Sequence, residues 1–169
     1  SSGADGFTLA SNTGVLTHAR ASSGAASMTI FKNGGSSVGE IRTSTTATQY
    51  LTSSDYRLKE NVTSITDGIV RVKQLKPSRF NFIADKDTTL DGFLAHETQT
   101  VVPEAISATK DATRDIGTIK DADGNVIDTN VEESAKENGQ TWEKTATENV
   151  YQGIDQAKLV PLLTAALQE

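Results

Sequence analysis

The sequence Ser53-Ser54-Asp55-Tyr56-Arg57-Leu58-Lys59 lies at the junction of two stretches of the chain that differ in composition. Before it, residues 7–52 are rich in Ser, Thr, Gly and Ala, whereas after it hydrophobic residues recur at helical spacing. The junction therefore divides the chain into two predicted domains, residues 1–53 and residues 54–169. Together they predict an α+β fold, with a strand-rich N-terminal part and a mixed C-terminal part.

The N-terminal part is predicted to form a stalk of short β-strands. Alternating runs at 7–9, 27–31, 37–41 and 48–51 are separated from their neighbours by turns such as Asn12-Thr13-Gly14 and Asn33-Gly34-Gly35. These strands bury too little apolar surface to offset the conformational entropy that folding removes. Three copies wound around one axis would pair the strand edges and share an apolar seam. We therefore expect an intertwined triple β-helix in a homotrimer, with a disordered Ser/Gly linker as the alternative.

The C-terminal part is predicted to combine helices with a hairpin. Hydrophobic residues at three- and four-residue intervals over 65–75 predict a helix that ends before a proline. A strand at 80–83 is expected to pair with residues 92–95 across a charged turn. Residues 158–167 predict a C-terminal helix with Asp155 as its cap. Its apolar face is wider than a surface helix needs, which favours self-association.

Ser54 and Lys59 are the residues of the junction that predict a reaction. A serine hydroxyl is a weak nucleophile without a base, and a lysine acts as that base when desolvation or a nearby cation such as Arg57 favours its neutral form. Ser54 directly follows the carbonyl of Ser53, so attack on that carbonyl needs almost no further loss of entropy, and the predicted cleavage site is the bond between them. Asp55 would orient the amine or strain the bond. The alternative is that Ser54 or Asp55 caps a helix, with the neighbouring charges solvated.

Composition and motif spacing bear on the expected partners and cofactors. The formal net charge of −6 argues against a nucleic-acid partner, and no apolar run is long enough to span a bilayer. The chain has no cysteine, so a disulfide or a thiolate metal site is excluded. His96-Glu97 lacks the second histidine of a zinc-protease helix, and Asp121-Ala122-Asp123-Gly124 lacks the closing glutamate of a calcium loop. We therefore expect no metal and no cofactor.

Four sequence blocks occur in a fixed order along the chain. They are SSDYRLKENV at 53–62, GFLAHE at 92–97, VVPEA at 101–105 and GIDQAKLVPLL at 153–163. Together they resemble the C-terminal intramolecular chaperone domain of phage tail fibres and tailspikes, also called the endosialidase-type or S74 peptidase family. Residues 110–149 resemble none of these blocks and are interpreted as a variable insertion.

The resemblance implies a specific activity. In that family the domain trimerises, guides the preceding stalk into an interwoven triple β-helix, and then releases itself by cutting before the serine of the first block. Carried over to this chain, it implies a single-turnover serine endopeptidase that cuts between Ser53 and Ser54, with Ser54 and Lys59 as the catalytic dyad. Asp55 and Arg57 are the expected supporting residues. ATP has been associated with release in some members, but the sequence has no Gly-rich phosphate loop, so we do not expect a nucleotide site.

The resemblance also implies partners and a location. The expected partners are further copies of the chain, its own upstream stalk, and a host-surface receptor for the parent fibre. The mature fibre would belong to the virion tail, and the chaperone domain would fold in the host cytoplasm before its release. Two other functions are compared with this one. One is a permanent trimeric tip that never cuts, with a structural or host-binding role; the other is a general protease, for which the sequence offers no oxyanion motif.

Overall fold

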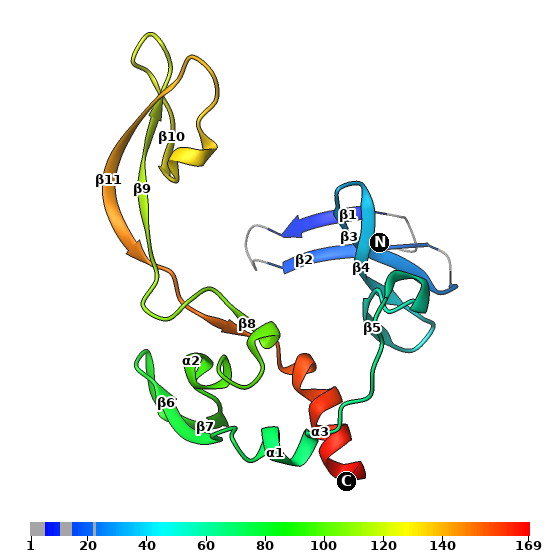
Figure 1. Ribbon diagram of the computed structural model, residues 1–169. Coiled ribbons are helices and arrows are strands. Elements are labelled where there is room, and N and C mark those ends of the chain that lie inside the picture. The colour runs from blue at the N-terminus through cyan, green and yellow to red at the C-terminus, as the bar shows by residue number, and fades with distance from the viewer. Residues whose placement is uncertain (1–5, 11–14, 22) are drawn as a thin grey trace. The chain divides into compact units, whose positions relative to one another are not determined.

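The computed structural model describes residues 6–10, 15–21 and 23–169 and confirms a mixed α+β fold (Figure 1). Spatial contacts divide the chain into a first unit, Ser1–Thr63, and a second unit, Ser64–Glu169. Within the described residues, every α-helix lies in the second unit. The junction segment with Ser54 and Lys59 belongs to the first unit, so its geometry is set by the strands that precede it.

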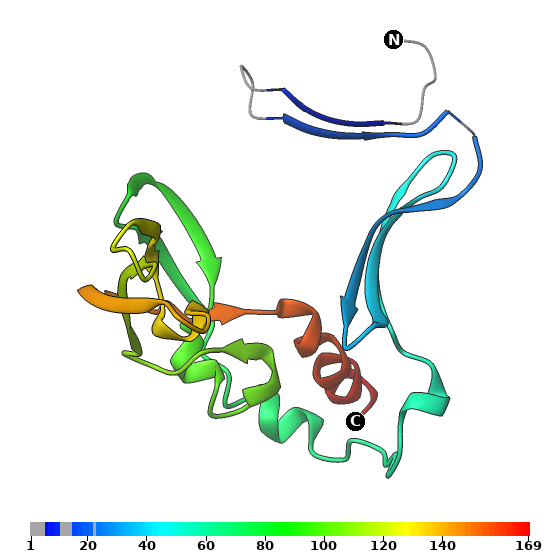
Figure 2. The ribbon, with the colours of Figure 1, turned by 90° about the horizontal axis from the view of Figure 1, so that it is seen from above.

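The described residues of the first unit form β-strands and one 3-10 turn. The elements are β1 (Gly6–Ala10), β2 (Val15–Ala19), β3 (Ala26–Asn33), β4 (Ser36–Thr43), β5 (Thr48–Thr52) and η1 (Tyr56–Leu58). β1 and β2 form an antiparallel hairpin, and β4 is the central strand of the antiparallel sheet β3–β4–β5 (Figure 2). The four runs predicted as strands therefore form β1, β3, β4 and β5, and β2 is an additional strand.

The turn between β3 and β4 follows the sequence prediction. Gly34 and Gly35 have φ angles of +54° and +83°, the left-handed conformation that a tight two-residue hairpin turn requires and that glycine adopts without steric cost. The other predicted turn, Asn12-Thr13-Gly14, lies outside the described residues.

The sheet of the first unit has no interior of its own. Neighbouring residues on a strand point to opposite faces, and Ile30 and Phe31 of β3 are each 52% exposed. Tyr50 and Leu51 of β5 are likewise exposed on opposite faces. In residues 16–21 and 23–63, no residue is fully buried. Both faces of the sheet therefore carry apolar side chains that nothing in this unit covers. The intertwined triple β-helix stays a prediction, because the strands here pair within one chain.

The second unit contains three α-helices, seven strands and three 3-10 turns among its residues. The helices and turns are α1 (Gly68–Val72), α2 (Ala95–Thr98), η2 (Pro103–Ala105), η3 (Glu133–Ala135), η4 (Gln156–Leu159) and α3 (Val160–Gln168). The strands are β6 (Ser78–Phe82), β7 (Asp85–Gly92), β8 (Ile106–Ser107), β9 (Thr113–Lys120), β10 (Val126–Val131), β11 (Thr141–Asn149) and β12 (Gly153–Ile154).

Two predicted elements of this unit differ in extent from the structure. The helix expected over 65–75 is only the single turn and a half of α1, because its start is fixed by packing against α3. The partner of β6 is β7, which begins inside the predicted charged turn and ends at Gly92, so only the first residue of the predicted partner 92–95 pairs with β6. The Asn81 amide donates to the Lys86 carbonyl at 3.0 Å and to Thr89 Oγ1 at 3.2 Å, and these bonds hold the observed register.

The core of the second unit gathers short elements around the C-terminal helix. The buried residues that form it are Val101, Val102, Ala105, Leu159 and Leu162, with Val72, Leu75, Phe93, Ile106 and Ile154 packed against them. The predicted C-terminal helix is confirmed as α3, with Pro161 in its first turn, where proline is tolerated. Asp155 Oδ1 accepts a hydrogen bond from the Ala157 N–H at 3.1 Å, so the predicted cap closes η4, directly before α3.

Helix α1 packs so closely on α3 that its first residue has to be glycine. A Cβ at Gly68 would lie 2.5 Å from the backbone nitrogen of Ala166. Asp67 makes no side-chain cap, and instead the Glu169 carboxylate accepts from the Gly68 N–H at 2.7 Å and the Ile69 N–H at 3.2 Å. Residues at the far end of the chain thus fix where the second unit begins (Figure 1).

Residues 113–149 form a long three-stranded sheet, which we call the arm, with β9 between β10 and β11 (Figure 1). Ile116 and Ile119 of β9 are buried, and a Cβ at Gly117 would meet the Trp142 indole at 2.5 Å. Trp142 Nε1 donates to the Val131 carbonyl at 3.0 Å. The segment interpreted as a variable insertion is therefore largely an ordered sheet, in which Trp142 joins β11 to β10.

Across the described part of the chain, we find no helix with the length and apolar character needed to cross a membrane.

Candidate functional site

The residue before the predicted cleavage bond is held by the sheet of the first unit. The Ser53 N–H donates to the Val38 carbonyl at 3.2 Å, which continues the pairing of β4 with β5 by one residue. The Ser53 hydroxyl donates to the Ser37 carbonyl at 3.4 Å. The backbone on the N-terminal side of the bond therefore has a fixed position, while Ser54 is the first residue beyond the sheet.

Asp55 organises the turn that follows. Its side chain accepts a hydrogen bond from the Arg57 N–H at 2.9 Å and so caps η1. The Arg57 guanidinium also binds both carboxylate oxygens, with Nε to Oδ1 at 2.9 Å and Nη2 to Oδ2 at 2.8 Å. The side-chain bond from Arg57 lowers the pKa of Asp55, and the same bond raises the pKa of Arg57. The helix-cap interpretation is thus correct for Asp55.

The turn of η1 brings Lys59 back to Ser54. Lys59 ends η1 in an extended conformation, with its N–H bonded to the Tyr56 carbonyl at 3.1 Å. Its Nζ lies 2.7 Å from Ser54 Oγ and donates a hydrogen bond to it. Because Arg57 binds both oxygens of Asp55, the ammonium of Lys59 is left to bind the serine hydroxyl. The cap at Asp55 and the contact between Ser54 and Lys59 therefore occur together, although the sequence presented them as alternatives.

The chain matches a known family from Ser54 onward. Residues 54–107 match the Peptidase_S74 family, described as chaperone of endosialidase. The resemblance inferred from the sequence blocks is confirmed for residues 54–107, which we call the S74 segment. The match starts at Ser54 and includes Lys59, the GFLAHE block and the VVPEA block, and it ends before the arm. A comparison with curated proteins finds no match.

The Ser54 hydroxyl and the Lys59 amine are positioned for a reaction, but both residues are exposed to water. Every residue from 45 to 63 is exposed in the single chain. Lys59 Nζ donates to Ser54 Oγ in the single chain, whereas a general base has to accept the hydroxyl proton. The geometry of the pair is in place, and activation would require that water be removed from the amine.

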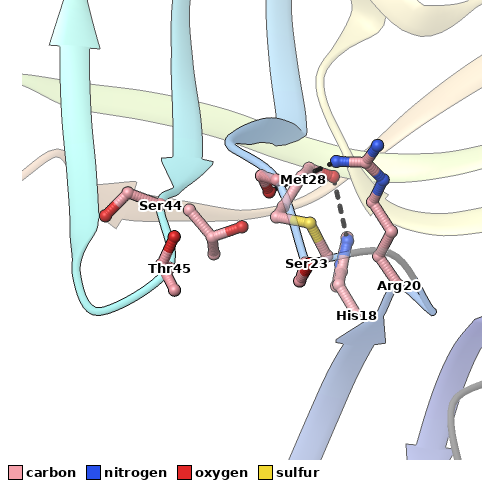
Figure 3. A pocket seen from close by; sticks show the side chains of 8 residues that line it. His18, Arg20, Ser23, Met28, Ser44 and Thr45 are labelled. Atoms are coloured by element: carbon pink, nitrogen blue, oxygen red, sulfur yellow. Dashed lines mark hydrogen bonds between the residues drawn. The ribbon is translucent and has the colours of Figure 1, made fainter.

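A polar pocket also lies in the first unit, and its lining residues precede Ser54 in the sequence. Figure 3 shows His18, Arg20, Ser23, Met28, Ser44 and Thr45 around a pocket of about 280 Å³. His18 Nδ1 lies 3.1 Å from the Met28 carbonyl, and Arg20 Nη1 donates to the Gly24 carbonyl at 3.5 Å. Among the described residues that line the pocket none carries a carboxylate, so these residues do not form the Ser–His–Asp arrangement of a hydrolase.

The other acidic and histidine motifs are occupied by structural contacts. Glu97 Oε1 accepts from Lys76 Nζ at 3.2 Å. The Asp121 carboxylate accepts from the backbone N–H groups of Asp123 and Asn125 at 3.0 and 2.8 Å and closes the turn between β9 and β10. Among the residues that the structure describes, no group of three or more His, Asp or Glu side chains is arranged to hold a metal ion.

The sequence did not indicate that β4 anchors the candidate site. Ser37 and Val38 contact Ser53 only because β4 and β5 pair in a register that aligns Gly39 with Thr52. The signal for this contact is the register between two strands, which local spacing around Ser54 does not contain. Ser54, Asp55, Arg57 and Lys59, in contrast, lie within one turn of backbone and are the residues that the sequence singled out.

Proposed function

We propose that this chain is an intramolecular chaperone that assembles as a homotrimer, directs the folding of the stalk before residue 54, and releases itself by one cut between Ser53 and Ser54. The observation that carries the proposal is the 2.7 Å contact between Lys59 Nζ and Ser54 Oγ. Ser54 is also the first residue of the S74 segment, so the matched family begins at the residue that cleavage would turn into a new N-terminus.

The proposed cut is an acyl transfer followed by hydrolysis. The neutral amine of Lys59 takes the proton of the Ser54 hydroxyl while Oγ attacks the carbonyl carbon of Ser53. The peptide C–N bond then breaks, the nitrogen of Ser54 takes the proton from Lys59, and the acyl group remains on Oγ as an ester. Water cleaves the ester, which leaves a carboxylate on Ser53 and restores the hydroxyl of Ser54. Attack on the adjacent carbonyl is intramolecular, so proximity replaces part of the activation that a general protease needs.

Asp55 and Arg57 are proposed as positioning residues for this step. Their two-point ion pair holds η1, and η1 sets the distance from Lys59 to Ser54. Loss of Arg57 would leave the Asp55 carboxylate as an alternative acceptor for the Lys59 ammonium, which would draw the amine away from the nucleophile.

The surface of the single chain supports an obligate assembly. One copy exposes 12980 Å². Two separate compact domains of the same total size would expose about 10,000 Å². The excess of about 3,000 Å² exceeds what one partner contributes to an interface of standard size, about 800 Å², and is in the range of obligate oligomers. The apolar side chains on both faces of the β3–β5 sheet fit this interpretation, since a sheet covered on both faces needs neighbours on both sides.

The chaperone part of the proposal follows from the difference in burial between the two units: the second has a buried core, and the described residues of the first have none. Strands that pair between chains have contacts between residues far apart, and such folds form slowly while their edges are exposed. A domain that folds alone and then trimerises holds three stalks at high local concentration and sets their register at one end. After release by cleavage, the stalk could no longer unfold by reversing the chaperone-assisted pathway. Its stability would then be set by a slow unfolding rate.

The setting of the mature protein is proposed on the family match alone. We place the stalk in a fibre of the virion tail, with a parent fibre that binds a host-surface receptor, and the released domain in the host cytoplasm. The alternative function, a permanent trimeric tip, shares the assembly and lacks the cut.

Denaturing intact-mass measurement of the purified chain tests the proposal. The wild-type chain is expected as two fragments, residues 1–53 and 54–169, whereas Ser54→Ala and Lys59→Ala are expected whole. Lys59→Arg keeps the positive charge but cannot act as the base, and it is also expected whole. Lys73→Ala, which removes an exposed lysine of the second unit, serves as the control and is expected to be cut like the wild type. A wild-type chain that is trimeric and uncut would contradict the cleavage and favour the permanent tip.

A further inference from the structure

Two neighbouring serines stand at the proposed cut, and each follows a peptide carbonyl that its hydroxyl could attack. Ser54 follows the carbonyl of Ser53, and Ser53 follows the carbonyl of Thr52. Proximity is the same for both serines, so it does not decide which bond breaks. Their contacts differ. Ser54 Oγ accepts a hydrogen bond from Lys59 Nζ at 2.7 Å. Ser53 Oγ instead donates to the Ser37 carbonyl at 3.4 Å, on the neighbouring strand.

Strand β4 contacts Ser53 at a point where its own pairing is irregular. Phe31 and Lys32 are neighbours on β3, but their partners on β4 are two residues apart, so Val38 lies between those partners as a β-bulge. A bulge interrupts the regular pattern of a strand and redirects its groups, and bulges are over-represented next to active sites. Here the carbonyls of two consecutive residues, Ser37 and Val38, both accept hydrogen bonds from Ser53.

These two bonds restrict how Ser53 can present its carbonyl. The Ser53 N–H donates to the Val38 carbonyl at 3.2 Å, and the hydroxyl of the same residue donates to the Ser37 carbonyl. The backbone of a residue has two soft rotations, φ and ψ. Because the nitrogen and the side chain are both held, φ is restricted, and ψ alone sets the direction of the carbonyl. Ser53 therefore offers its carbonyl carbon to Ser54 over a narrow range of orientations.

We propose that the Ser53 hydroxyl is the positioning group that determines the specificity of the cut. It holds the carbonyl that Ser54 attacks, and its own bond to β4 keeps it from acting as a second nucleophile. This inference rests on the proposed function and adds the kind of side chain that the cut requires on its N-terminal side. A chain with a hydroxyl at position 53 would be cut efficiently, and a chain without one would be cut slowly. The bond between Thr52 and Ser53 would stay intact.

The rate of the cut in variants of residue 53 provides the first test. The full chain is diluted from denaturant to one fixed concentration and sampled over time by denaturing mass measurement. Ser53→Thr keeps the hydroxyl and is expected to cut at close to the wild-type rate. Ser53→Val has the shape of the threonine variant without its hydroxyl, and Ser53→Ala removes the hydroxyl alone. Both are expected to cut about two- to tenfold more slowly, as the loss of one neutral hydrogen bond predicts.

The threonine and valine variants separate positioning from the stability of the stalk. Both residues favour strands, so a slow Ser53→Val chain would not result from weaker pairing of β5 with β4. In a Ser54→Ala background, which keeps both chains whole, the two variants are expected to give the same circular dichroism. Ser37→Ala is the matched control. It removes a hydroxyl from β4 but keeps the carbonyl that accepts from Ser53, so it is expected to cut at the wild-type rate.

The masses of the fragments provide the second test. The wild-type chain is expected to give only residues 1–53 and 54–169, and fragments 1–52 and 53–169 would overturn the inference. A Ser53→Val chain that is cut at the wild-type rate, or a Ser53→Thr chain as slow as Ser53→Val, would also overturn it while the proposed function stands. A wild-type chain that is never cut would contradict the proposed function and the inference together.

Discussion

The two units of this chain use the same kinds of residues for different ends. The second unit gathers Val102, Leu159 and Leu162 into a buried core. The contact of Gly68 with α3 joins the beginning of this unit to its C-terminal helix. The first unit places its apolar side chains on both faces of a thin sheet and on η1, where no residue that the structure describes is fully buried. The proposed function requires this difference: a second unit that folds on its own and a first unit that depends on other copies.

This division explains why the candidate site lies at the junction. Ser53 is attached to the sheet of the first unit through Val38, whereas the S74 segment begins at Ser54. A cut at that bond would separate the strands of the first unit from η1 and the second unit. The strands would remain in the fibre, and η1 would leave together with the second unit.

The largest expected effect concerns the core of the second unit. Leu162→Ala is expected to lower the free energy of unfolding of the second unit by about 2–5 kcal/mol, because it leaves a cavity in a packed core. Leu51→Ala in the first unit is the matched change and is expected to leave that transition unmoved. Helical circular dichroism in urea, at a concentration that keeps the chain monomeric, would measure both. Equal losses for the two variants would remove the distinction between the units.

A second change tests the arm. In Gly117→Val the new side chain would meet the Glu143 carbonyl, which lies 2.4 Å from the Cβ position, and the indole of Trp142. Overpacking of this kind costs about 1–3 kcal/mol. Because Trp142 is the single tryptophan of the chain, its fluorescence reports the arm directly. Gly24→Ala in the first unit, where nothing lies within 4 Å of the Cβ position, is the control, and a similar shift in both variants would contradict the packing described here.

A third change tests the lock between the ends of the second unit. Glu169→Ala removes the carboxylate that accepts from the Gly68 and Ile69 N–H groups. The loss of such a cap costs about 0.5–2 kcal/mol. Gln168→Ala next to it is the control and is expected to have little effect. Urea unfolding of the full chain checks the pair, and a Glu169→Ala variant as stable as the control would show that α1 does not need the cap.

The smallest expected effect is the dependence of the arm on pH. The hydrogen bond from Lys144 at 2.7 Å, with a further one from Thr147, lowers the pKa of Asp115 below its ordinary 3.8. Since the pKa is lower in the folded chain, the ionised carboxylate stabilises the arm above about pH 3.8 and this contribution is lost as the pH falls further. Asp115→Asn is expected to flatten the change in Trp142 fluorescence between about pH 5 and pH 2, because such a carboxylate titrates over roughly this range. Asp123→Asn in the exposed turn is the control and is expected to behave like the wild type.

Local sequence predicted the elements that depend on neighbours in the chain. The two glycines of the β3–β4 turn, the leucines of α3 and the cap at Asp155 are all visible in short windows, and the structure has each of them. The arrangement of Ser54 with Lys59 also lies within one turn. What the sequence could not provide is the pairing between distant segments: β7 as the partner of β6, Glu169 at the start of α1, and Val38 as the anchor of Ser53. These contacts depend on register and on packing, which short windows do not encode.

The dependence of the first unit on the second is tested most directly by the state of residues 1–53 with and without the rest of the chain. The fragment released from the full wild-type chain and the same fragment produced alone would be compared by native mass measurement and by circular dichroism. The account predicts a β-rich trimer from the full chain and an unfolded monomer from the fragment produced alone. A fragment that forms the same trimer without residues 54–169 would contradict the chaperone function.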